Sequence, residues 1–138
     1  MPVTFRLIPE LGLVFVRYEG HAVIEDTAAA FADYVRSPGF APGQKQFVDL
    51  SEVTSMKTDY ADLMDLQVQK AFALVGRGVQ TLIAYHAPTP ETLEIARLSQ
   101  RSWEGIDAVI PRVFTRRAEA LAFLGIAECS FARVMARV

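Results

Sequence analysis

The stretch VQTLIAYHAPTPETLEIARL, residues 79–98, decides the fold class. Its first seven residues form a nearly continuous apolar run of strand length, which predicts a central strand covered on both sides. Thr89, Pro90 and Glu91 then predict a helix start, because they supply a cap residue, a proline at the first helical position and an acid. A buried strand followed directly by a helix is typical of an α/β protein with a parallel sheet.

The pattern continues toward the C-terminus with one more strand and one more helix. Residues 108–114 predict a strand, and Pro111 inside it favours a sheet edge because proline cannot donate to a hydrogen-bonded ladder. Thr115 then predicts the N-cap of a short helix that ends at Gly125. Strands that alternate with helices in this way predict parallel pairing with right-handed crossovers.

The N-terminal part adds a hairpin, a helix and a third strand. Two runs of period 2, residues 3–8 and 13–18, flank the turn sequence PELG and predict an antiparallel hairpin. The spacing then changes to period 3.6 and predicts a helix from Ile24 to about residue 36. Residues 45–50 predict the third strand.

A loop over residues 51–58 is expected to lead into the second helix, with Thr58 as the N-cap and the end near residue 75. Its apolar residues are expected to face inward, at positions Tyr60, Leu63, Met64, Val68, Ala71 and Val75.

We therefore expect a single-domain α/β fold of order ββαβαβαβα, followed by a C-terminal helical segment. The predicted five-stranded sheet is mixed and mostly parallel, with helices mainly on one face. Residues 1–125 account for this domain, and residues 126–138 form a C-terminal helical extension of it.

The C-terminal extension carries an apolar stripe at helical spacing, which includes Phe131, Val134 and Met135. A 13-residue isolated helix is marginal in water, so this segment must dock on something. It docks either on its own domain or on a second subunit. We expect a homodimer, and these three residues are its candidate contacts.

Composition excludes several classes of protein. Of 138 residues, 51% are hydrophobic and 22% are charged, which is typical of a globular domain and not of a disordered chain. The net charge of −2 argues against a nucleic-acid partner. A lone Cys129 cannot form an internal disulfide, and neither a signal peptide nor a membrane span is apparent, so we expect a cytoplasmic protein.

No motif predicts catalysis, a metal or a cofactor. His21 and His86 lack metal-ligand spacing, and the sequence contains neither G-x-S-x-G nor a Walker A motif. Ligands of open α/β sheets bind at the carboxyl ends of strands, where Asp49, His86 and Arg116 are expected. These three could form an acid–base pair with an anion clamp for a small molecule, or serve as ordinary turn and surface residues.

Residues 47–64, FVDLSEVTSMKTDYADLM, resemble the middle of the STAS domain family, where a strand ends in an Asp-Leu-Ser-like turn before a loop and a helix. Residues 17–35, RYEGHAVIEDTAAAFADYV, resemble that family's second strand, Gly turn and first helix. The resemblance extends over about residues 3–125 and is closest to the stand-alone, SpoIIAA-like bacterial proteins, which are anti-sigma-factor-antagonist-like.

This resemblance implies a non-enzymatic regulatory module that acts through an unknown protein partner. It also implies phosphorylation of a hydroxyl in the loop before the second helix, with Ser51, Ser55 and Thr58 as candidates. The chain departs from the family's Asp-Ser-Ser-Gly pattern, because Met56 and Lys57 occupy the centre of that loop. The same superfold includes lipid-carrying relatives of the Sec14 type, which implies a small apolar ligand as an alternative.

Overall fold

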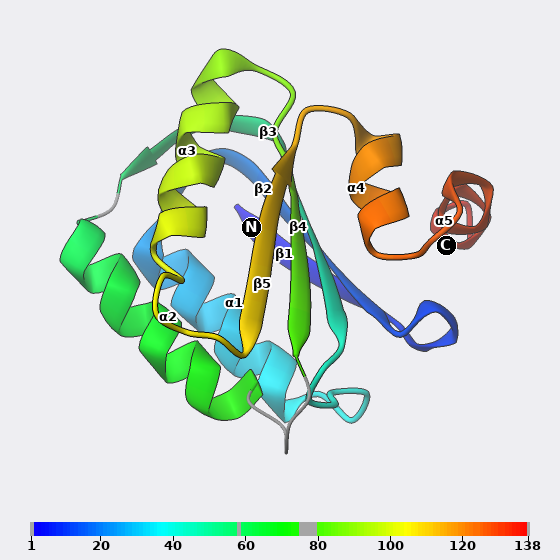
Figure 1. The fold of residues 1–138 in the computed structure, drawn as a ribbon, viewed down its shortest axis with the longest axis horizontal. Helices are drawn as coiled ribbons and strands as arrows, with labels where there is room; N and C mark the ends of the chain where they lie inside the picture. The colour runs from blue at the N-terminus through cyan, green and yellow to red at the C-terminus, as the bar shows by residue number, and fades with distance from the viewer. Residues whose placement is uncertain (1, 58, 75–79, 138) are drawn as a thin grey trace.

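A five-stranded sheet forms the centre of the molecule, and helices lie on both of its faces (Figure 1). The computed structural model describes residues 2–57, 59–74 and 80–137. Within these ranges the elements follow in the order β1 (Val3–Ile8), a short 3-10 helix η1 (Pro9–Leu11), β2 (Leu13–Val23), α1 (Ile24–Arg36), β3 (Lys45–Lys57), α2 (Tyr60–Leu74), β4 (Thr81–His86), α3 (Pro90–Arg101), β5 (Val109–Phe114), α4 (Arg117–Phe123) and α5 (Glu128–Met135).

The strands lie side by side in the order in which they occur in the chain. β1 pairs antiparallel with β2, and the pairs β2–β3, β3–β4 and β4–β5 are all parallel. β5 forms one edge of the sheet, so the edge position predicted from Pro111 is confirmed. The predicted single-domain α/β fold with a mixed, mostly parallel sheet is confirmed as well.

Alternating residues of the strands form two hydrophobic clusters, one on each face of the sheet. Val48 and Leu50 face α1, α2 and α3, whereas Phe47, which directly precedes Val48, faces α4 and α5. This alternation follows from the two-residue period of a strand. Figure 1 shows α1–α3 on one side of the sheet and α4 and α5 on the other.

β2 and β3 extend further than their sequence patterns predict. β3 runs through Lys57, so the loop expected over residues 51–58 is a strand as far as residue 57, and Thr58 lies outside the described residues. β2 continues to Val23 beyond a register shift at Gly20, whose φ of +65° is a conformation that glycine adopts readily. The expected Gly turn is therefore a bulge within a longer strand.

α2 buries a narrower stripe than expected. Leu63 is buried as expected, and so are Leu66 and Gln67, whereas Tyr60, Met64 and Val68 are exposed. The expected inward orientation of these three is wrong, because α1 is the element against which α2 packs most extensively and these three side chains lie outside that contact. Val75 lies outside the described residues.

Candidate functional site

Asp49 and His86 lie together, as expected, but only His86 lies at the carboxyl end of its strand, β4, whereas Asp49 lies within β3, which continues to Lys57. The two residues are paired across the parallel strands, and Asp49 Oδ1 lies 3.2 Å from His86 Nδ1. Their side chains are only 16% and 13% exposed, respectively. The Ser51 amide also donates to Asp49 Oδ1, at 3.0 Å. Burial alone would raise the pKa of Asp49, but the hydrogen bonds from His86 and Ser51 outweigh it and lower that pKa.

Arg116 does not join this pair. Its side chain is 79% exposed, and its Nη1 lies 3.9 Å from Glu119 on α4. Arg116 precedes α4 as its N-cap residue, so its side chain does not follow the inward alternation of β5. The arginine in register with Asp49 is Arg17 on β2. Its side chain forms an ion pair with Glu19 at 3.2 Å. The expected acid–base site with an anion clamp at Arg116 is therefore not assembled.

The hydroxyl candidates for phosphorylation differ in accessibility. Ser51 is half-buried beside Asp49, whereas Ser55 is exposed on β3. Ser55 Oγ lies 2.6 Å from His21 Nδ1 on the adjacent strand. Thr58 lies outside the described residues. Of the two described hydroxyl candidates, Ser55 is thus the more exposed.

The apolar stripe of α5 docks on its own chain. Phe131 is 3% exposed and lies 5.3 Å from Phe47 and 5.5 Å from Phe15, measured between ring centroids. Val134 is buried in the same cluster, and Met135 is half-buried beside it. Phe131 and Val134 are thereby covered by the chain itself and leave little surface for a second subunit.

Arg6 on β1 binds the C-terminal end of α5. Its Nη2 donates to the backbone oxygens of Val134 and Arg137, both at 3.1 Å. Arg137 in turn pairs with Glu10 at 2.8 Å. A cation that caps the last carbonyls of a helix favours that helix end, so these contacts reinforce the docking of α5 on the sheet.

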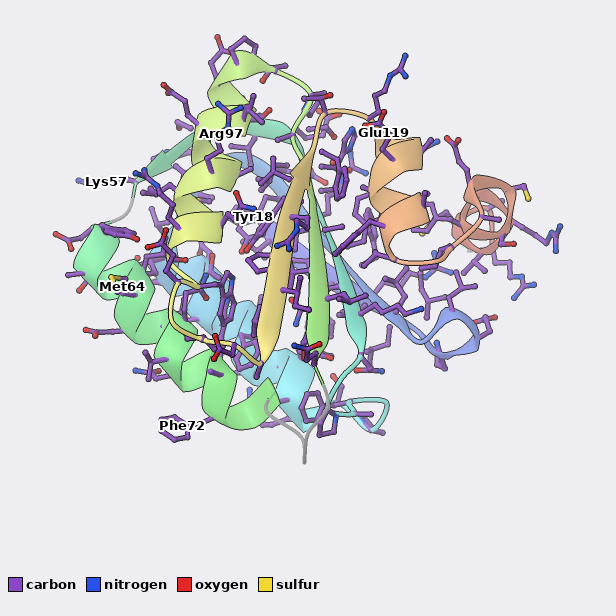
Figure 2. All side chains as sticks on the ribbon, in the orientation of Figure 1. Tyr18, Lys57, Met64, Phe72, Arg97 and Glu119 are labelled. Atoms are coloured by element: carbon purple, nitrogen blue, oxygen red, sulfur yellow. The ribbon has the colours of Figure 1, made fainter. Side chains whose placement is uncertain are left out.

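A cavity of about 60 Å³ lies on the other face, between the sheet and α1–α3. Its lining is predominantly aliphatic and aromatic, and it includes Tyr18, Tyr85 and Trp103. Burial raises the pKa of Tyr18 to about 12, so its hydroxyl stays neutral and bonds Thr27 Oγ1 at 3.1 Å. Figure 2 shows Tyr18 in the interior of the molecule.

Lys70 of α2 also lines this cavity, although no sequence motif marks it as a functional residue. Its ammonium lies 5.6 Å from the centroid of the Phe31 ring. Burial lowers the pKa of Lys70 to about 8. The available signal was spacing, because Lys70 falls at i+7 from the inward Leu63, a position that normally carries an apolar residue.

The outer side of α2 carries a second apolar stripe. Tyr60, Met64, Val68 and Phe72 follow one another at four-residue spacing and are 38%, 41%, 48% and 83% exposed. Figure 2 shows Phe72 projecting away from the ribbon at the end of α2, with Met64 on the same outer side. A shallow groove next to this stripe is lined by Val68, Ala71, Phe72 and Ile106.

Comparisons with known proteins concern the fold. The chain is similar in structure to one described as the anti-sigma factor antagonist SpoIIAA in its unphosphorylated form. The TM-score is 0.49 at 11% sequence identity, over 96% of this chain and 97% of that one. The likeness concerns the course of the backbone and not binding or activity. No family model and no curated protein matches the sequence.

None of the described helices is long and apolar enough to cross a membrane. Within the described ranges, no group of three or more His, Cys, Asp or Glu is placed to hold a metal ion.

Proposed function

We propose that the chain is a non-catalytic regulatory module that binds another protein through the exposed apolar stripe of α2, defined by Tyr60, Met64, Val68 and Phe72. The observation that carries this proposal is the exposure of four large apolar side chains on one helix, with Phe72 at 83%. Exposed apolar side chains are common singly, whereas a contiguous row of them is typical of an interaction site.

The spacing of the stripe favours a helix as the partner element. Residues four apart form the ridges that pack into the grooves of a second helix. Tyr60 and Phe72 are twelve positions apart, so the ridge is about 18 Å long at ~1.5 Å per residue. The groove between Phe72 and Ile106 offers a place for an apolar anchor of that helix.

Acidic residues on the helix that carries the stripe favour a basic partner. Asp62 and Asp65 are exposed on the same helix. A second copy of this face, or an anionic membrane, would place like charges opposite these carboxylates, which opposes binding. We therefore infer that the partner is an amphipathic helix with lysine or arginine beside its apolar anchors. The homodimer and the cytoplasmic location expected from the sequence stay predictions.

The proposal is tested with a photo-crosslinking amino acid at position 72 in cells of the native host. Position 119, which is exposed on α4 at the opposite side of the molecule, is the matched control. We expect a protein adduct at position 72 and none at 119. The adduct should disappear with Val68→Ser. Charge reversal, with Asp62→Lys and Asp65→Lys together, should weaken the purified complex.

Three outcomes would contradict the proposal. They are adducts only with lipid or with a second copy of this chain, equal adducts at both positions, and a complex that the charge reversal does not weaken. Far-UV circular dichroism of each variant checks that α2 is retained.

A further inference from the structure

The cavity between the sheet and α1–α3 is large enough for part of a small molecule. Its volume of about 60 Å³ is several times the roughly 10–15 Å³ that one water molecule needs. Val48 and Ile83 contribute to its floor on the sheet, and Ala30 and Phe31 of α1 contribute to its wall. An apolar group of a few heavy atoms therefore fits, whereas a long lipid chain does not fit without movement of a helix.

The buried hydroxyls of the lining already have partners within the protein. Tyr18 bonds Thr27, and the Tyr85 hydroxyl accepts hydrogen bonds from Ser99 Oγ and Trp103 Nε1, both at 3.0 Å. Because these groups satisfy one another, a ligand gains little by competing for them. The side of the cavity that they form is suited to an apolar tail.

Lys70 differs from these groups. Among the residues that the structure describes, no carboxylate forms an ion pair with its ammonium. Its ammonium lies over the ring of Phe31, 5.6 Å from the ring centroid, and burial lowers the pKa of Lys70 to about 8. The ammonium has thus lost part of its hydration without gaining an anion as a partner. A bound anion would offset this desolvation cost by pairing with the ammonium.

We propose that this cavity binds a small monocarboxylic acid with a short aliphatic tail, whose carboxylate pairs with Lys70 and whose tail lies against the apolar lining. A single ammonium pairs with one negative charge, and a second charge on a phosphate or a dicarboxylate would stay unpaired against the apolar lining, so a monoanion is favoured. The site lies on the inner side of α2 and is independent of the outer stripe that the proposed function uses.

Trp103 provides a direct measurement of binding. It is the single tryptophan of the chain, it is buried, and it lines the cavity. Its fluorescence is recorded during titration with hexanoate. Hexanol and hexylammonium, which share the tail and differ in charge, are the control compounds. Thermal unfolding with and without each compound gives a second readout.

Lys70→Met tests the ion pair, because methionine keeps an unbranched side chain and removes the charge. Lys57→Met is the matched control, since Lys57 is an exposed lysine that does not line the cavity. We expect hexanoate to bind saturably and more tightly than hexanol or hexylammonium. We expect Lys70→Met to weaken hexanoate by roughly 10- to 100-fold and to leave hexanol unchanged.

Ala30→Leu tests the tail site separately by filling the cavity, and it should weaken hexanoate and hexanol alike. The proposal is overturned if hexanoate gives no saturable change, or if hexanol binds as tightly as hexanoate. It is also overturned if Lys70→Met and Lys57→Met bind hexanoate equally. Circular dichroism establishes that each variant is folded, and if Lys70→Met is unfolded, Lys70→Gln replaces it with the same expected outcomes.

Discussion

The contact of α5 with the sheet includes one buried aromatic side chain, and replacing Phe131 by alanine measures how much that side chain contributes. Phe131 is 3% exposed, stacks on Phe47 with an interplanar angle of 20° and meets Phe15 edge-on at 73°. Phe131→Ala removes both ring contacts and leaves a void in the cluster that α4, α5 and the sheet share.

The expected loss follows from the burial of this ring. Phenylalanine-to-alanine changes in a core cost about 3–5 kcal/mol, of which each ring pair contributes ~0.5–1.5 kcal/mol beyond its buried area. α5 is the last element of the chain and can detach, which limits the cost to what its docking contributes. We therefore expect the free energy of unfolding to fall by about 3 kcal/mol, a large part of the ~5–15 kcal/mol typical of a domain.

Urea unfolding followed by circular dichroism measures this loss, and Phe72→Ala is the matched control. Phe72 is 83% exposed, so the same chemical change there should alter the free energy of unfolding by no more than ~0.5 kcal/mol. A loss below about 1 kcal/mol for Phe131→Ala, or equal losses for both variants, would refute the docking of α5 on its own sheet.

Two further predictions concern stability. Because the pKa of Asp49 is lowered from 3.8, its stabilisation is present above about pH 4 and is lost as the pH falls through the folded-state pKa. Asp49→Asn should cost roughly 1–2 kcal/mol at pH 7 and progressively less below pH ~4, as measured by urea unfolding across pH; a cost that does not depend on pH would contradict this. Thr89 caps α3 by accepting a hydrogen bond from the Thr92 amide at 3.2 Å, so Thr89→Ala should cost about 1 kcal/mol in the same assay, and Thr89→Ser should restore most of it. An unchanged midpoint for Thr89→Ala would show that the cap contributes nothing.

Elements with strong local signals could be predicted from the sequence. The start of α3 is one of them, because Thr89 and Pro90 act through their own backbone geometry and need no distant partner. The edge position of β5 is another, since Pro111 lacks a donor wherever it lies. The ends of β2 and β3 could not be predicted, because the bulge at Gly20 shifts the register and conceals the continuation of pairing.

The positions of the candidate site residues could likewise be predicted only in part. Asp49 and His86 could be placed together because they follow apolar runs that pair as adjacent parallel strands, although β3 continues eight residues beyond Asp49. Arg116 could not be placed, because its side chain follows the turn into α4 and pairs with Glu119. Ser55 was assigned to a loop, whereas it lies on a strand beside His21.

The sequence by itself determined the order of the strands and helices, the antiparallel hairpin, the mostly parallel character of the sheet and the presence of an apolar C-terminal stripe. These follow from periodicity and from caps, turns and prolines, which act locally. Only the tertiary structure decided which side of α2 is covered, where the stripe of α5 docks, and that Lys70 faces an apolar cavity. Periodicity reports that a helix has apolar faces, whereas the neighbouring elements decide which of those faces is buried.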